Sequence, residues 1–184
     1  MPKLDDLKSF LCEHDSKIFT IGETWLKPGL EFSVPGFNCI RQDRNDGYGG
    51  VLIGLSTELE FHRISLPIVN PIEIVACRVK IKSFHFSIAS VYVSPLSYVD
   101  KQTLRQLFAL IPQPMFVLGD FNAHGTAWGE EEDDSRSQLL YEVFEEFQLN
   151  VLNTGEITRV AAPPTRSSRI DLSLCSASLS LNCS

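Results

Sequence analysis

A short apolar run that ends in a polar cluster is the part of this sequence best suited to chemistry. Residues 115–118 have the length and composition of a buried strand, and Gly119 marks its end. Three polar residues then follow at alternate positions: Asp120, Asn122 and His124. A rigid strand can hold short carboxylate and amide side chains in the fixed geometry that metal and phosphate chemistry requires. The same residue types are common in turns, so the pattern alone leaves a plain polar turn as an equal alternative.

Three further polar residues lie at or near the ends of apolar runs. Glu23 follows residues 18–21, Tyr92 is near the end of residues 84–93, and Asp171 lies within residues 170–174. Carboxylates at strand ends, without a cysteine or histidine ligand set, suit a hard, oxygen-liganded cation such as Mg²⁺ and not zinc. Phosphate chemistry is the natural use of such a site, although a strand-end Asp such as Asp171 can equally serve only to accept backbone hydrogen bonds.

Alternating helices and strands are predicted to position these residues. Apolar residues at helical spacing predict helices over residues 4–14, 101–110 and 135–148, with Asp100 as the N-cap of the second. Strands are predicted over residues 18–21, 37–41, 51–55, 72–81, 84–93, 115–118, 149–152 and 170–174. Residues 72–81 and 84–93 are separated by two residues only, which indicates an antiparallel pair. The pattern predicts a layered α/β fold with mixed sheets.

Composition limits the class of protein and its ligands. The 184 residues, 43% of them apolar, are enough for one domain with a sizeable core, and no boundary divides them. The formal charge of −7 opposes nucleic acid, so a polyanionic substrate needs a local basic patch or a bridging cation. Arg44, in a charged segment otherwise expected to be a solvated loop, is one candidate for contacting a phosphate backbone.

The remaining sequence features exclude several kinds of site. Five scattered cysteines, none in a C-x-x-C pair, are expected to be free thiols in a reducing compartment. Residues 47–50 are rich in glycine but precede their strand and lack the G-x-G-x-x-G spacing, and the acidic residues 130–134 lack the register of a calcium loop. With no signal peptide and no long apolar stretch, the chain is expected to be soluble and intracellular.

Five segments carry a resemblance to a known family. They are Gly22-Glu-Thr-Trp-Leu26, Gly49-Gly-Val51, Val91-Tyr-Val-Ser-Pro95, Leu118-Gly-Asp-Phe-Asn-Ala-His124 with Trp128-Gly129, and Ser168-Arg-Ile-Asp-Leu172. In these segments the chain resembles the endonuclease/exonuclease/phosphatase superfamily, and within it the endonuclease domain of non-LTR (LINE-type) retrotransposons. The resemblance extends over almost the whole chain, and its most specific segment is the one around Asp120.

This resemblance implies a fold, an activity and a set of roles. The implied fold is a four-layer α/β sandwich with two mixed sheets flanked by helices, and the implied activity is Mg²⁺-dependent nicking of DNA, with Mn²⁺ as a substitute. Glu23 would hold the metal, Asp120 would activate or orient the attacking water, and Asn122 would hold that water or a phosphate oxygen. Tyr92 would hydrogen-bond the phosphate and Asp171 would orient a catalytic histidine. The remaining candidates are substrate-binding residues: His124, Arg169 and Arg44.

The family pattern also includes features that these 184 residues lack. They are a first strand bearing an Asn and a terminal Ser-Asp-His segment, so the fold is expected to lack its first and last strands, and an exposed sheet edge invites a partner. Two alternatives therefore stay open for this polypeptide: an active endonuclease, or a non-enzymatic binding module on the same fold. A third is an abasic-site DNA repair endonuclease or a phosphatase of the superfamily. The expected partners are DNA and a reverse transcriptase domain in a longer parent polyprotein, with a nuclear location implied.

Overall fold

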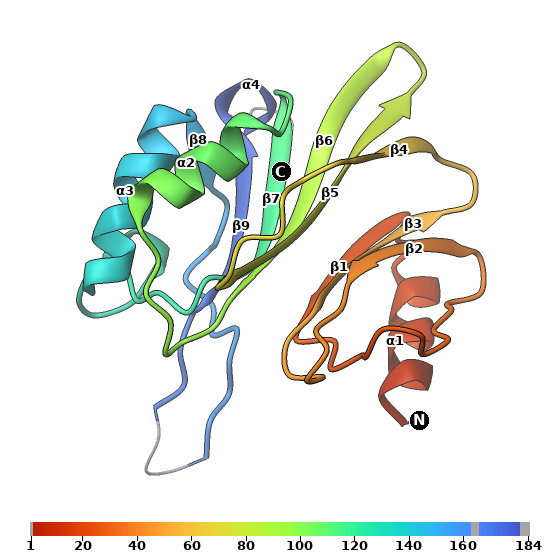
Figure 1. Cartoon of the computed structure of the whole chain (residues 1–184), viewed down its shortest axis with the longest axis horizontal. Coiled ribbons are helices and arrows are strands. Elements are labelled where there is room, and N and C mark those ends of the chain that lie inside the picture. The colour runs from red at the N-terminus through yellow and green to blue at the C-terminus, as the bar shows by residue number, and fades with distance from the viewer. Residues whose placement is uncertain (1, 163–165, 181–184) are drawn as a thin grey trace.

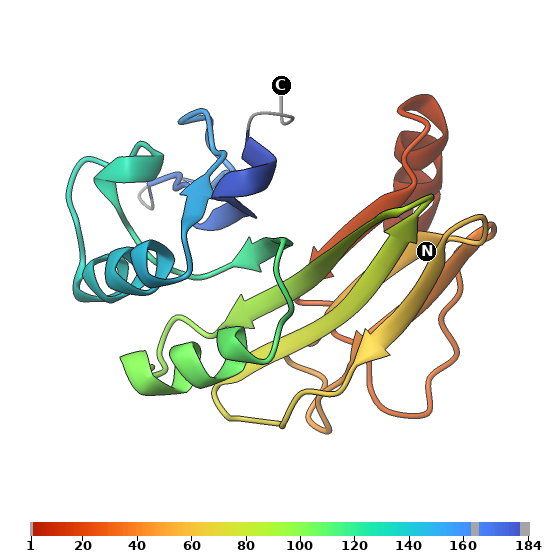
Figure 2. The same cartoon turned by 90° about the horizontal axis from the view of Figure 1, so that it is seen from above.

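The molecule is built in four layers (Figure 1). The computed structural model describes residues 2–162 and 166–180. Helix α1 (Pro2–Glu13) lies outside a three-stranded sheet, a six-stranded sheet packs against the other face of that sheet, and helices α2 (Lys101–Ala109) and α3 (Ser135–Glu146) cover the far side. The second view shows the same separation of the two sheets from above (Figure 2). The predicted layered α/β class is confirmed.

The smaller sheet is entirely antiparallel. Its strands are β1 (Ile18–Gly22), β2 (Phe37–Gln42) and β3 (Val51–Ser56), in the order β1-β3-β2. Because both neighbours run antiparallel to β3, the expectation of two mixed sheets is wrong for this one.

The larger sheet is mixed and has the order β4-β5-β6-β7-β9-β8. Its strands are β4 (Glu60–Ile64), β5 (Ile72–Ile81), β6 (Phe84–Val93), β7 (Met115–Asp120), β8 (Leu149–Val151) and β9 (Asp171–Ser176). The β5–β6 hairpin has the predicted bounds, and Lys82 adopts a φ of 57° in its two-residue turn. Among the strand pairs of the described residues, only β6–β7 is parallel, and α2 makes the crossover between these two strands.

Along the strands of the large sheet, side chains at alternate positions pack into two different hydrophobic cores. On β5, Ile72, Ile74 and Ala76 face the helices, whereas Val75, Cys77 and Val79 face the small sheet. The same alternation holds on β7, where Val117 belongs to the helix side and Leu118 packs toward the small sheet. Because both faces are covered, these strands are apolar at nearly every position.

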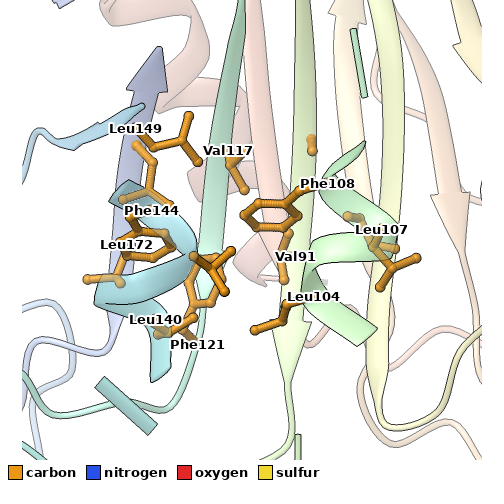
Figure 3. Packing of buried hydrophobic residues seen from close by; sticks show 14 of the residues in the cluster. Val91, Leu104, Leu107, Phe108, Val117, Phe121, Leu140, Phe144, Leu149 and Leu172 are labelled. Atoms are coloured by element: carbon orange, nitrogen blue, oxygen red, sulfur yellow. The ribbon is translucent and has the colours of Figure 1, made fainter. Parts of the chain in front are cut away.

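The helix-side core explains why α2 and α3 form where they do (Figure 3). Asp100 caps α2 by accepting a hydrogen bond from the Thr103 backbone, which confirms its predicted role, and Asp134 caps α3 in the same way. Leu104, Leu107 and Phe108, which recur at helical spacing, form the buried face of α2. Phe108 lies among Val91, Val117 and the side chains of α3.

The structure corrects three boundaries near the polar residues. Strand β7 continues through Gly119 to Asp120, so Gly119 lies within the strand and does not end it. Strand β9 begins at Asp171, which is therefore its exposed first residue and not an interior one. Strand β4 was not predicted, because exposed polar residues interrupt its apolar pattern.

The cysteines and the helices were compared with the expectations of free thiols and of no membrane-spanning segment. Cys12, Cys39 and Cys77 are free thiols, while Cys183 and the start of the Pro163-Pro164 loop lie outside the described residues. Within residues 2–162 and 166–180, no helix has the length and hydropathy needed to cross a bilayer.

Candidate active site

Three predicted site residues form one row across the large sheet. Tyr92 on β6 is in register with Asp120 on β7, and Asp120 is in register with Asp171 on β9. Because β6 and β7 are parallel, both end at the same edge, and β9 runs antiparallel and begins there. All three share the side of the sheet that faces the small sheet, the side occupied by Phe116 and Leu118. Sheet geometry alone thus brings together residues that lie far apart in the sequence.

Glu23 joins this row from the other sheet. It follows β1, and its Oε1 accepts a hydrogen bond of 2.8 Å from the Tyr92 hydroxyl. The backbone of Glu23 is left-handed, with a φ of 51°, a strained conformation for a residue other than glycine. The exposed Glu23 carboxylate therefore lies at the end of β1, within hydrogen-bonding distance of Tyr92 on the large sheet.

Asp120 is partly buried and titrates near neutrality. Burial raises the pKa of its carboxyl to about 7, and the nearby Asp171 and Glu23 charges contribute in the same direction. The Asn122 backbone amide, which donates to Asp120 Oδ1 at 2.8 Å, and Arg159 oppose the rise. A carboxyl group with this pKa can release or take up a proton near pH 7, as a general base or acid requires.

Asn122 and Gly119 shape the chain on either side of Asp120. Asn122 has a left-handed φ of 46°, and its Nδ2 donates to the Val93 carbonyl at 3.0 Å. Gly119 has a φ of 148°, and a Cβ at this position would overlap the carbonyl oxygen of Val91. Glycine is needed here because β6 and β7 approach too closely for a side chain, so this residue sets the position of Asp120.

Tyr92 is held as a hydrogen-bond donor. Burial raises the pKa of its phenol, and the hydrogen bond to Glu23 and the negative charge of that group raise it further. The hydroxyl therefore stays protonated throughout the neutral range, and its proton is directed at Glu23. This geometry gives Tyr92 a role in orienting Glu23, while its predicted contact with a phosphate stays a prediction.

These side chains line a single open pocket, here called the strand-end pocket, with a volume of about 350 Å³. It contains the five residues predicted to be catalytic or metal-binding and four others; the full lining is Glu23, Tyr92, Pro95, Asp120, Asn122, Thr158, Arg159, Ile170 and Asp171. The Thr158 hydroxyl accepts from the Asp171 backbone at 3.2 Å, and Arg159 adds a cation to an otherwise acidic site. Sequence reasoning missed both residues because the loop that carries them has no periodic pattern.

The three predicted substrate-binding residues lie outside this pocket. His124 and Arg169 line an adjacent pocket of about 490 Å³, which shares Arg159 with the first. Arg44 contacts Asp46 and the buried Glu73, so its charge is already compensated within the protein. Their roles in binding substrate stay predictions.

None of the four histidines lines the strand-end pocket. His124 is the nearest in sequence, and its Nδ1 lies 3.4 Å from Glu130. His14 packs on Phe10 with ring centroids 4.3 Å apart, and the other two lie on β4 and β6. Asp171 therefore has no histidine partner among the described residues of this pocket.

The donor atoms of the pocket fit a magnesium ion bound through few protein ligands. Its carboxylate and amide oxygens are the ligand type that Mg²⁺ prefers. Burial, and to a lesser extent the charges of Asp171 and Glu23, raise the pKa of Asp120, and a cation bound nearby would favour its ionised form. Among residues 2–162 and 166–180, no three His, Cys, Asp or Glu side chains are grouped closely enough to hold a metal ion. The residues present suit a hydrated Mg²⁺ that is held by one or two carboxylates and completed by waters and a substrate phosphate.

The sequence of the chain matches a known family over its second half. Residues 86–184, just over half of the 184, match the model of a family described as endonuclease-reverse transcriptase. The matched segment contains Tyr92, Asp120, Asn122 and Asp171 but not Glu23, which lies in the first half of the chain.

Curated relatives are much longer proteins encoded by mobile elements. The chain is 25% identical over 156 residues to the RNA-directed DNA polymerase from mobile element jockey of Drosophila melanogaster, covering 84% of this chain and 17% of that protein. It is 23% identical over 167 residues to the probable RNA-directed DNA polymerase from transposon BS of Drosophila melanogaster, covering 89% of this chain and 18% of that protein. The chain thus spans less than a fifth of the length of these relatives.

Solved structures share the fold. The endonuclease domain of TRAS1, a telomere-specific non-LTR retrotransposon, superposes with a TM-score of 0.77 at 19% identity, covering 96% of this chain and 80% of that one. The 3′ phosphatase NExo from Neisseria, bound to product DNA hairpin, gives a TM-score of 0.68 at 16% identity, covering 97% and 83%. These similarities confirm the expected α/β fold with two sheets flanked by helices.

Proposed function

Since the chain belongs to the endonuclease-reverse transcriptase family, we propose that it hydrolyses a phosphodiester bond of DNA with Mg²⁺ as cofactor. Its fold, which is similar to that of a non-LTR retrotransposon endonuclease domain, supports this proposal. The observation that carries the proposal is the convergence of Glu23, Tyr92, Asp120, Asn122 and Asp171 in one pocket. The proposed context is a longer polypeptide that also carries a reverse transcriptase, acting on nuclear DNA.

The residues of the pocket would divide the reaction among them. Asp120, with a pKa of about 7, would take a proton from the attacking water, and Asn122 would hold that water or a phosphate oxygen. Arg159 at the rim would attract the phosphate backbone. Glu23, oriented by the Tyr92 hydroxyl, would hold the metal. When bound, Mg²⁺ would supply positive charge that neutralises the scissile phosphate and the leaving 3′ oxygen.

Nicking of supercoiled plasmid DNA tests this function. The purified chain should convert supercoiled to relaxed plasmid with Mg²⁺ and not with EDTA, and Asp120→Asn should reduce the rate by about 10²- to 10⁴-fold, as is typical for loss of a general base. Glu142→Gln, which changes an exposed carboxylate on α3, is the matched control and should nick at the wild-type rate. Equal nicking by the wild-type chain and the Asp120→Asn variant would refute the assignment.

A second candidate, a DNA-binding module without catalytic activity, is favoured by one observation. The strand-end pocket contains no histidine to act with Asp171. A folded chain that binds DNA in a salt-dependent manner but does not nick it would support this candidate. Nicking that depends on both Mg²⁺ and Asp120 would exclude it.

A further inference from the structure

Two large aromatic side chains are exposed beside the strand-end pocket. Trp25 is 63% exposed and Tyr48 is 69% exposed, and their ring centroids lie 6.2 Å apart with the ring planes at 62°. Trp25 is only two residues from Glu23, which lines the strand-end pocket. Single exposed apolar side chains are common, but two large rings in contact with each other form a contiguous apolar patch, and such patches often mark binding sites.

Backbone hydrogen bonds hold the two turns that carry these rings. The Trp25 amide donates to the Gly49 carbonyl at 2.8 Å, which ties the turn after β1 to the glycine-rich turn before β3. Trp25 also has a left-handed φ of 54°, a strained conformation that this backbone contact helps to maintain. The Tyr48 amide donates to Asp46 Oδ1 at 3.1 Å, which fixes the start of the second turn.

A buried carboxylate anchors the glycine-rich turn before β3, and through it the turn after β1. Glu73 on β5 is 4% exposed; it accepts a hydrogen bond from the Gly50 amide and one of 3.1 Å from Arg44 Nη1. Arg44 in turn donates to Asp46 at 3.0 Å, and Asp46 holds the Tyr48 amide. Glu73 is also in register with Tyr92, the residue that orients Glu23. The two aromatic residues and the strand-end pocket therefore share one rigid support.

Lys27, two residues after Trp25, places a basic residue on the same pair of turns. The aliphatic stem of Lys27 covers Gly47 so closely that a Cβ at Gly47 would lie 2.7 Å from Lys27 Cε. Exposed rings next to a lysine are the arrangement with which proteins bind unpaired nucleic-acid strands, because bases stack on the rings and the phosphates meet the cation.

We propose that Trp25 and Tyr48 form a stacking surface for an unpaired nucleobase of the DNA strand that enters the strand-end pocket. The inference deepens the proposed function, on which it rests. A paired base within a duplex exposes only its edges in the grooves, so stacking on an exposed ring face of the pair requires a base that has left the stack. The surface would thereby favour DNA with an unpaired base beside the bond to be cut.

Tryptophan fluorescence offers a direct test. The chain contains two tryptophans, and the other, Trp128, is 1% exposed, so a nucleobase in solution can reach only Trp25. In EDTA, which prevents metal-dependent cleavage, the emission of wild-type protein should be quenched by a duplex that carries one extrahelical base. A duplex with an abasic residue at the same bulge should quench weakly, and Trp25→Phe should abolish the quenching while keeping a ring for stacking.

Binding affinity gives a second, independent measurement. Trp25→Ala and Tyr48→Ala should each weaken binding of the bulged duplex by about tenfold, within the range found for loss of one base-stacking contact. Both variants should bind the abasic duplex as the wild type does. Phe10→Ala is the matched control, because Phe10 is an aromatic residue 57% exposed on α1, on the outer side of the small sheet, and its loss should leave both affinities unchanged.

The outcomes separate this inference from the proposed function. A chain that nicks plasmid in an Asp120-dependent manner but binds base and abasic duplexes equally would overturn the stacking surface and leave the nuclease proposal intact. Quenching and base-dependent binding without nicking would support the stacking surface and count against the nuclease. Absence of DNA binding by the folded chain, or an equal loss of affinity for both duplexes in Trp25→Ala, would overturn the stacking surface.

Discussion

Replacing Asp120 with asparagine should change how the stability of the protein depends on pH. In the folded chain the pKa of this carboxyl is raised from 3.8 to about 7, because ionisation there is opposed by burial and by the charges of Asp171 and Glu23. The unfolded chain ionises at its ordinary pKa. Asp120 thus contributes no penalty below about pH 4, and the free energy of unfolding falls as the pH rises from about 4 to about 7.

The size of the effect follows from the same pKa. A rise from 3.8 to about 7 corresponds to about 4 kcal/mol against the ionised form, at 1.36 kcal/mol for each pH unit. Asp120 is partly exposed, so solvent screens these charges, and we expect about half of that figure, ~2 kcal/mol. An asparagine side chain cannot ionise, so the Asp120→Asn variant should gain ~2 kcal/mol relative to the wild type between about pH 4 and pH 7.

Urea denaturation at several pH values, followed by circular dichroism without divalent metal, measures this difference. Titrating groups that do not interact with Asp120 affect both proteins equally, so the informative quantity is the difference in unfolding free energy between them at each pH. The Asp100→Asn variant is a useful comparison, because the pKa of Asp100 is lowered by its hydrogen bonds to Thr103 and its pH dependence should have the opposite sign. Parallel curves for the wild type and Asp120→Asn from pH 4 to pH 8 would refute the electrostatic reasoning.

Three further predictions concern the support of the site. Tyr92→Phe removes the 2.8 Å hydrogen bond to Glu23 and should slow plasmid nicking by at least about tenfold, while stability falls by only about 0.5–1.5 kcal/mol in urea denaturation. Phe108→Ala leaves a cavity in the helix-side core and should lower the unfolding free energy by about 3–5 kcal/mol, measured in the same way. Gly119→Ala should cost about 3 kcal/mol, because its Cβ would overlap the Val91 carbonyl oxygen, and it should also abolish nicking.

Each of these three predictions has a control variant or an outcome that would contradict it. For Tyr92, a loss of stability as large as that from a core deletion would mean that the hydroxyl is structural and does not serve to orient Glu23. For the helix-side core, Leu110→Ala changes a residue that is 48% exposed at the end of α2 and should be nearly neutral. For the glycine, Gly155→Ala removes a glycine with a φ of 87° but open space around it, so it should cost less than the change at Gly119.

Strong periodic patterns made much of the fold predictable. The pairing of β5 with β6 and the helix that begins after Asp100 were predicted from residue patterns, and both agree with the structure. The end of β7 was misjudged because glycine usually marks a turn, whereas Gly119 is needed here for a close approach between two strands. Strand β4 went unpredicted because it is an edge strand with little buried surface.

The candidate site was predictable only where residues sit on regular elements. Glu23, Tyr92 and Asp120 follow or end strands, so their meeting could be expected from the resemblance and from the topology that it implies. Arg159 was missed because it lies on a loop that folds back onto the edge of the sheet. The path of such a loop cannot be predicted from the residues within it. Glu73 gave a local signal, since it is a charged residue in an apolar run, but its partners Arg44 and Gly50 are distant in sequence.

The strand-end pocket takes residues from both sheets, so its geometry depends on how those sheets rest on each other. The side chains between them include Val51, Ile53, Val75 and Ile88, all of which are apolar and none of which lines the pocket. A single loss such as Ile53→Val removes one buried methylene and typically costs about 0.5–1.5 kcal/mol, and several together would let Glu23 drift from Asp120. A related gene copy can therefore retain every polar residue of the pocket and still encode no working site. The function of such a copy therefore depends on the apolar residues between the sheets as much as on the acidic residues of the pocket.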